Sequence, residues 1–208
     1  DWNLEGKFVV GYLGTHGMAH ALDNVLDAAE LLRDEPNICF LLVGNGAERE
    51  KLIASAQERQ LDNVIFAPSQ PRSEMPRVWS LCDVALVHLK NSPTFAEVIP
   101  SKIFEAMAMG CPILLASPKG AASSIVTGDN AGIWVPAEQP GQLAQCVLRL
   151  VRDVDEFQVL AANALGAAPK YSRRQQSEEM LQVLEIAAIG RGDRVAPFLS
   201  GQAATLAG

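Results

Sequence analysis

Several features are missing from this sequence, and each absence excludes a class of protein. The 208 residues carry a formal charge of −7, and no run of Lys and Arg is longer than Arg173-Arg174. The chain therefore lacks the basic stripe with which proteins bind the backbone of a nucleic acid. The longest apolar stretch, residues 103–116, is interrupted by a glutamate, a glycine and a proline, and it falls short of the ~20 residues of a membrane span. We expect neither a nucleic-acid partner nor a transmembrane segment.

Cysteine is sparse and scattered, which argues against a metal centre or a disulfide framework. The four cysteines form no CxxC pair, and each stands among apolar neighbours: Cys39, Cys82, Cys111 and Cys146. Isolated cysteines of this kind are typical of small buried thiols in a reducing compartment. The sequence therefore predicts reduced core cysteines, no bound metal and a cytoplasmic location.

The first residues lack the marks of a natural start. Asp1-Trp2-Asn3 contains no initiator methionine, and the cationic and apolar regions of a signal peptide do not follow it. We therefore expect the chain to be cut from a longer protein.

Strand-like and helix-like segments alternate along the chain. Segments with apolar residues at helical spacing separate six short β-rich runs, at 7–13, 38–43, 64–66, 84–89, 112–116 and 132–135. Because the runs are apolar on both faces, the alternation predicts a Rossmann-like doubly wound α/β domain, a parallel sheet of about six strands with helices on both faces. We expect this domain to span 1–187 and 188–208 to be a tail, because the last residues hold too few large apolar side chains for a core. Ligands bind at the carboxyl ends of the strands in such sheets, so the site should lie in the loops that follow them.

One segment, residues 97–112, has the most specific pattern. Pro100 suits the first position of a helix, and Gly110 with Pro112 supplies a stop, so we predict a helix over 100–109. Helical spacing places one set of side chains against the sheet, namely Ile103, Phe104, Met107 and Ala108. It places a polar set together on another face, namely Ser101, Lys102 and Glu105.

The polar face of this predicted helix suits a nucleoside diphosphate. The free amides at a helix start attract phosphate, and Lys102 would add a mobile full charge there. The Glu105 carboxylate, roughly 6 to 8 Å further along the axis, can accept hydrogen bonds from both hydroxyls of a ribose. The alternative is that Lys102 and Glu105 form a surface pair at i,i+3 spacing and that Glu97 is merely solvated.

Further motifs give this pattern a family resemblance. Glu97 and Glu105 have the spacing of the E-x7-E signature of glycosyltransferase family 4, and the residues from Glu105 to Pro112 resemble its "EAMA-G-P" ending. Residues 9–14, 42–46 and 131–135 resemble the first strand, the "VGxG" turn and the last strand of the same domain. Residues 7–187 thus resemble the C-terminal, donor-binding domain of a GT-B, group 1 enzyme. The resemblance implies an N-terminal acceptor domain that this chain does not contain.

The resemblance implies a role for each matching residue. Glu105 would bind the ribose diol, and Glu97 would contact hydroxyls of the donor sugar. Lys102 would hold the diphosphate together with the amides around Ser101, and it would carry the catalytic stabilisation of charge, with Glu97 as the other catalytic candidate. Gly44 would approach the donor in the turn that resembles "VGxG".

The loop after the first strand departs from the family pattern. The family carries an arginine directly after the glycine and a lysine five residues later, whereas this chain has Thr15 and His20 after Gly14. The Gly14-Thr15-His16-Gly17 loop resembles a bacterial branch of the family that builds surface polysaccharides. There the glycines would let the backbone approach the phosphates, and His16 or His20 would donate a hydrogen bond to them or to the acceptor. Which histidine does so is left open by the sequence.

The function implied is that of a glycosyltransferase in polysaccharide or lipopolysaccharide biosynthesis. It would transfer a hexose-type sugar from a nucleoside diphosphate, UDP by expectation, to a lipid-linked or saccharide hydroxyl acceptor, with retention and without a metal or cofactor. The missing domain would place the protein at the inner membrane, and this part alone would be inactive. Three alternatives remain: a sugar-nucleotide epimerase of GT-B architecture, a non-catalytic nucleotide-binding module, and an unrelated flavodoxin-like domain.

Overall fold

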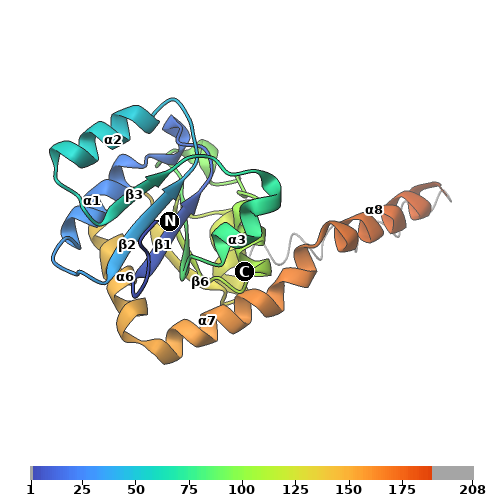
Figure 1. The fold of residues 1–208 in the computed structure, drawn as a ribbon. Helices are drawn as coiled ribbons and strands as arrows, with labels where there is room; N and C mark the ends of the chain where they lie inside the picture. Colours follow the sequence, from blue (N-terminus) through green and yellow to red (C-terminus); the bar gives the residue numbers. More distant parts are fainter. Residues whose placement is uncertain (1, 189–208) are drawn as a thin grey trace.

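Six strands form one parallel sheet in the computed structural model, which describes residues 2–188 (Figure 1). The strands are β1 (Phe8–Leu13), β2 (Ile38–Val43), β3 (Val64–Ala67), β4 (Val84–His88), β5 (Ile113–Ser117) and β6 (Gly132–Pro136). Their order across the sheet is β3-β2-β1-β4-β5-β6, and every neighbouring pair is parallel. This is the Rossmann order, which confirms the predicted fold class and differs from the flavodoxin-like order.

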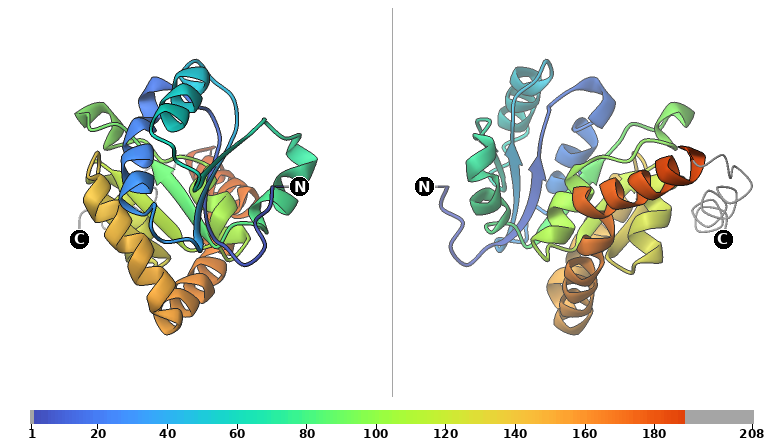
Figure 2. Two further views of the ribbon diagram at one scale, coloured as in Figure 1. Left: turned by 60° about the vertical axis from the view of Figure 1, so that its left-hand side comes forward. Right: turned by 90° about the vertical axis from the view of Figure 1, so that its right-hand side faces the viewer.

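Helices cover both faces of the sheet (Figure 2). One face packs on α1 (Asp23–Leu31), α2 (Arg49–Glu58) and α6 (Pro140–Arg152). The other face packs on α3 (Met75–Trp79), α4 (Lys102–Ala108), α5 (Ala121–Gly128) and α7 (Val154–Ala167). Short 3-10 turns complete the domain, at η1 (Met18–His20), η2 (Arg72–Glu74), η3 (Pro93–Phe95) and η4 (Ala168–Tyr171).

The central strands are apolar on both faces because both faces are covered. Along β1, Val10 and Tyr12 belong to the core under α1 and α6, whereas Val9 and Leu13 belong to the core under α4. All four side chains are at most 3% exposed. Burying a large apolar side chain contributes about 1.5–3 kcal/mol, so β1 anchors both layers and holds the turn that follows it in place.

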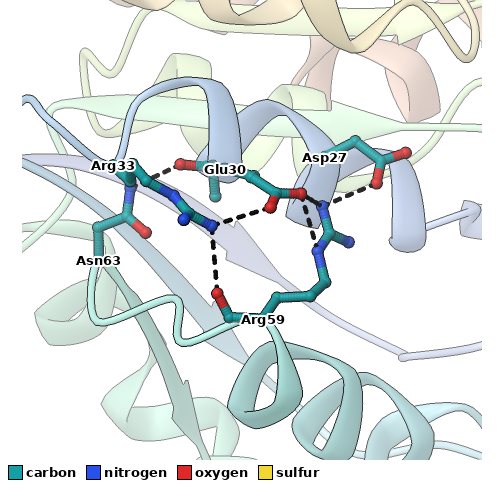
Figure 3. Close-up of polar contacts among 6 residues, drawn as sticks. Asp27, Glu30, Arg33, Arg59 and Asn63 are labelled. Atoms are coloured by element: carbon teal, nitrogen blue, oxygen red, sulfur yellow. Dashed lines mark hydrogen bonds and ion pairs between the residues drawn. The ribbon is translucent and has the colours of Figure 1, made fainter.

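A polar cluster ties α1 to the end of α2 (Figure 3). The Arg59 guanidinium forms ion pairs with Glu30 and with Asp27, and Arg33 forms a further pair with Glu30 and donates to the Arg59 carbonyl. Beside them, the Asn63 side chain donates to the carbonyl of Ala29 at 2.8 Å. These groups are partly exposed, so solvent screens them, and their main effect is to fix the spacing of the two helices.

Helix α4 begins later and faces differently than the sequence predicts. Residue Ser101 lies in the turn before the helix, which runs over Lys102–Ala108. Ile103, Ala106 and Met107 are the buried residues, while Ala108 is exposed. The expectation that Ala108 packs on the sheet was therefore wrong. The buried arc is centred on Ile103, and a residue five positions later points about 140° away from it.

The end of the described chain departs from the sheet. Helix α8 (Arg173–Ala188) follows η4 and projects away from the domain (Figures 1 and 2). Beyond position 188 the predicted tail lies outside the described residues.

Within residues 2–188 no helix is long and apolar enough to span a bilayer. All four cysteines are free thiols and each is buried or half-buried, as predicted.

Candidate functional site at the carboxyl edge of the sheet

A cavity of about 490 Å³ lies at the carboxyl ends of β1 and β2. Its walls come from the loops after β1, β2 and β3 and from the first turn of α4, which are the positions that the doubly wound fold predicts for a ligand. Ligand sites for small molecules usually measure about 300–1,000 Å³. The cavity is therefore large enough for a nucleotide-sized ligand.

The structure brings together seven of the predicted site residues around this cavity. These are Gly14, Thr15, His20, Gly44, Ser101, Lys102 and Glu105. Three others lie outside the lining: His16, Gly17 and Glu97. The lining also includes residues outside the predicted set, among them Asn45, Ser69, Gln70 and Met75.

The floor of the cavity is made of two interlocked glycine turns. A Cβ atom built on Gly44 would lie 1.8 Å from the carbonyl oxygen of Gly14, and one built on Gly46 would lie 2.4 Å from the carbonyl oxygen of His16. The amide of Gly14 donates to the carbonyl of Val43 at 2.9 Å. Only glycine permits this approach of backbone to backbone, so the β1 and β2 turns form one bare surface of main chain.

Lys102 reaches over that floor. Its Nζ atom lies 3.7 Å from the centre of the Tyr12 ring, and a Cβ atom on Gly14 would lie 2.8 Å from it. The atom is buried and has no hydrogen-bond partner among residues 2–188. Burial lowers the pKa of Lys102 to about 7, and the Glu105 carboxylate opposes that shift. The prediction that the Lys102 charge is mobile was wrong, because the amine is enclosed over the Tyr12 ring.

The two glutamates of the E-x7-E pattern are placed differently. Glu105 lines the cavity one turn along α4 from Ser101, is exposed, and accepts a hydrogen bond from the Ser101 hydroxyl at 3.4 Å. Glu97 lies on the connection between η3 and α4, and its exposed side chain is not part of the lining. We expected Glu97, Lys102 and Glu105 to face one cavity. Lys102 and Glu105 do so, but Glu97 does not, because it lies on the connection before α4 begins.

His20 is held at the cavity by a second histidine that the sequence did not single out. The Nδ1 atom of His88, at the end of β4, lies 2.7 Å from the His20 carbonyl oxygen, and the Nδ1 atom of His20 lies 3.2 Å from the His88 carbonyl oxygen. His88 is 1% exposed, and burial lowers its pKa to about 4. Burial, reinforced by the charge of Lys102, also lowers the pKa of His20.

His16 is enclosed beneath the loop. Its ring lies 5.9 Å from that of Tyr12 and 6.2 Å from that of Phe66, and the residue is 0% exposed. Within the described chain neither ring nitrogen has a hydrogen-bond partner. Burial above all, then the charges of Arg49, Lys102 and His20, lowers the pKa of His16 to about 4. Of the two loop histidines, only His20 faces the cavity.

The acidic groups of the described chain do not form a metal site. Residues 2–188 contain no cluster of three or more His, Cys, Asp or Glu side chains arranged to hold a metal ion. The one Asp-x-Asp triplet in the sequence is Asp153-Val154-Asp155, at the start of α7. There Asp153 accepts a hydrogen bond from the Glu156 amide at 2.8 Å, so it caps α7.

The fold and the cavity define a class of protein. A doubly wound parallel sheet with glycine turns, a lysine and an exposed carboxylate at its carboxyl edge is the arrangement of a nucleotide-binding domain. Comparison with known proteins then gives the family. Residues 2–165 match the family described as glycosyl transferases group 1, and the chain belongs to that family.

Relatives and solved structures agree with this assignment. The chain is 30% identical over 192 residues to the probable glycosyltransferase WbjE of Pseudomonas aeruginosa, a match that covers 92% of this chain and 45% of that protein. It thus spans less than half the length of this relative. Anabaena HepE, solved with UDP and glucose, superposes with a TM-score of 0.74 at 23% identity over 86% of this chain and 49% of its own. The C-terminal domain of the group 1 protein LpcC from Francisella tularensis gives 0.68 at 21% identity, over 81% of this chain and 88% of its own.

Proposed function

We propose that this chain is the donor-binding domain of a GT-B glycosyltransferase and that its cavity holds a nucleoside-diphosphate sugar, UDP-linked by preference. The observation that carries the proposal is the placement of Lys102 and Glu105 on the first turns of α4, both facing one cavity floored by the Gly14 and Gly44 turns. A cation and bare main chain suit a diphosphate, and a carboxylate one turn away suits a ribose diol.

Each part of the proposed donor has residues that would contact it. The diphosphate lies on the Gly14 and Gly44 turns, between Lys102 and His20, with Ser101 and Thr15 at its edge. Glu105 accepts the ribose hydroxyls. We assign the histidine contact to His20 rather than His16, because His20 lines the cavity and His16 is enclosed beneath it. Glu97 lies outside the lining, so its proposed contact with the donor sugar rests on the E-x7-E resemblance.

The reaction proposed is retaining, metal-independent transfer of the sugar to a hydroxyl acceptor. Negative charge grows on the diphosphate as the glycosidic bond breaks, and a buried ammonium stabilises that charge more strongly than a solvated one would. Lys102 is the catalytic residue that meets this requirement, because its Nζ is enclosed at the cavity floor. A proton taken up by Lys102 as donor arrives leaves the site with a full positive charge where the leaving group needs it.

The proposal extends to the protein of which this domain forms part. The acceptor, a lipid-linked or other saccharide, would be held by an N-terminal domain, and the reaction would occur between the two domains. Two relatives are described as the probable glycosyltransferase WbjE and the putative colanic acid biosynthesis glycosyl transferase WcaI of Escherichia coli. By analogy with them we propose a place in bacterial polysaccharide or lipopolysaccharide synthesis, in the cytoplasm at the inner membrane.

The ribose contact gives the most direct test. We expect calorimetry to show UDP binding to the chain and an affinity at least tenfold lower for Glu105→Ala, since a lost hydrogen bond to a charged group costs about 1.5–3 kcal/mol. The same substitution should leave the affinity for 2′,3′-dideoxy-UDP unchanged, because that ligand lacks the diol. Glu58→Ala, an exposed glutamate on α2 outside the cavity, is the matched control. Equal UDP affinity in Glu105→Ala and the parent chain would refute the assignment. Binding that persists in EDTA would support independence from metal.

A further inference from the structure

The ring of Tyr12 occupies a position that the donor site itself does not explain. Tyr12 is 0% exposed in β1, and its ring belongs to the core on the α1 and α6 side of the sheet. Lys102 comes from α4, on the other side of the sheet. The Lys102 side chain therefore crosses the carboxyl edge of the sheet and ends over the Tyr12 ring, with 3.7 Å between Nζ and the ring centre.

The contact supports an amine that has no hydrogen bond within the described residues. Nζ is buried and donates to no hydrogen-bond acceptor within residues 2–188, and the Glu105 carboxylate favours its charged form through charge alone. An aromatic face attracts a cation through its quadrupole, and the attraction is strongest when the pair is desolvated. The aromatic face thus favours the ammonium over the neutral amine at this position.

The hydroxyl of the same ring is tied to the loop on the cavity rim. Tyr12 Oη donates to the carbonyl oxygen of Thr15 at 2.7 Å. Burial raises the pKa of Tyr12, so the hydroxyl keeps its proton at any ordinary pH. One side chain therefore contacts two parts of the proposed diphosphate site. The ring contacts Lys102, and the hydroxyl contacts the turn that begins at Gly14.

We propose that Tyr12 is a positioning residue for the donor site, whose ring holds the Lys102 ammonium against the Gly14 turn where the diphosphate binds. The proposal rests on the proposed function, because it takes the ligand of Lys102 to be a diphosphate. Tyr12 does not touch the donor. It acts through Lys102, by holding the amine at a fixed place before the donor arrives and by favouring its protonated form.

Other titratable groups surround the same amine and have to be separated from the effect of the ring. Glu105 on α4 favours the charged amine, whereas Lys102 itself disfavours the charging of His16 and His20 on the loop after β1. The phosphate of UDP titrates equally in the parent chain and in a Tyr12 variant, whereas the rings of His16 and His20 lie 5.9 and 5.8 Å from the Tyr12 ring and are affected by its loss. The ratio of the two dissociation constants for UDP at one pH therefore removes the titration of UDP, and the NMR signal of Lys102 separates the amine from the two histidines.

Two substitutions divide the roles of the ring and the hydroxyl. Tyr12→Phe keeps the ring, and we expect its UDP affinity to stay within about threefold of the parent chain. Tyr12→Leu removes the ring, and we expect a loss of about tenfold at pH 8 that shrinks at pH 6, where the amine is protonated without help. Phe40→Leu is the matched control, because Phe40 is an equally buried ring in β2 of the same core but outside the cavity lining. The ratio of UDP affinities between Phe40→Leu and the parent chain should be the same at pH 8 and pH 6.

The outcomes separate this proposal from the proposed function. Absence of UDP binding in the parent chain would overturn both. Tight UDP binding in Tyr12→Leu at pH 8, or an equal loss in Tyr12→Phe, would overturn the role of the ring and leave donor binding standing. A measurement on the parent chain covers the case in which Tyr12→Leu does not fold. The Hε protons of Lys102, assigned in NMR spectra by comparison with Lys102→Arg, should show an upfield ring-current shift, and an ordinary lysine position would overturn the proposal.

Discussion

His20 and His88 each carry their proton on Nδ1 in the neutral form, because each uses that atom to donate to the carbonyl oxygen of the other. The consequence for His20 is chemical. Its other ring nitrogen, Nε2, then holds a lone pair, so a neutral His20 accepts hydrogen bonds there and does not donate them. His20 has to gain a second proton before Nε2 can donate to a phosphate, whereas an arginine at such a site would always be charged.

Loss of the histidine pair should destabilise the domain. His88→Leu removes the 2.7 Å hydrogen bond to the His20 carbonyl and leaves that partly buried oxygen unpaired, which costs about 1–3 kcal/mol. We expect a fall of that size in the free energy of unfolding, measured with urea at pH 7.5, and weaker UDP binding. His88→Asn keeps a side-chain donor and should lose less. Equal losses in the two variants would show that the hydrogen bond is unimportant.

Removal of the Lys102 amine should stabilise the fold while it harms binding. Protonation of the buried amine costs free energy in the folded chain, since its pKa is lowered to about 7 from an ordinary value of 10.5. The cost is absent above pH 10.5, grows as the pH falls, and is complete below about pH 7. Lys102→Met should therefore raise the free energy of unfolding at pH 7 by about 1–3 kcal/mol and reduce UDP affinity more than tenfold. A Lys102→Met chain that is no more stable than its parent would contradict this account.

The buried His16 should make the domain sensitive to mild acid. The folded pKa is about 4 and the ordinary value is 6.5, so between these values the unfolded chain binds a proton that the folded chain excludes. Stability is lost as the pH falls from about 6.5 to 4, on the order of 2 kcal/mol for one such group. Burial lowers the pKa of His88 to about 4 as well. His16→Leu should therefore remove only part of the loss of stability between pH 6.5 and pH 4. Urea unfolding of both chains at pH 7.5 and pH 5 checks this, and parallel falls would rule out the His16 contribution.

The glycine floor should tolerate no side chain. Gly44→Ala places a methyl group 1.8 Å from the Gly14 carbonyl oxygen, so the two turns have to separate. We expect a loss of more than about 2 kcal/mol in unfolding free energy and a loss of UDP binding. Gly166→Ala is the control: the position is exposed in α7 with no atom within 4 Å of the added carbon. It should gain about 0.5–1 kcal/mol from helix propensity. Thermal unfolding of the two variants should therefore change in opposite directions.

The fold was predictable from the sequence because its signal is local. Runs such as Ile38–Val43 are apolar at every position, which only a strand buried on both faces requires. The site was predictable where one short segment carries it, as with Ser101, Lys102 and Glu105, whose helical spacing places them on one wall. The strand order followed from no single segment and emerged only in the structure.

The rest depends on contacts between distant segments. Nothing near Lys102 in the sequence indicates that its amine ends over Tyr12, because the ring belongs to the core on the other side of the sheet. His88 is one polar residue in an apolar strand, and its partner His20 lies 68 positions away. Glu97 has the expected spacing from Glu105 but sits before the helix begins, so spacing alone does not fix where its side chain points.

The cavity draws its lining from the segments that follow β1, β2 and β3, from the start of α3 and from the start of α4, between Leu13 and Glu105. No fragment that lacks one of these segments contains the whole lining. A ligand can bind in the cavity only after these distant segments have packed together. Ligand binding therefore requires the folded domain and not only locally ordered segments. Bound nucleotide would then protect the entire unit against unfolding, in proportion to the logarithm of ligand concentration over its dissociation constant. The ligand would thus stabilise the fold of the domain that binds it.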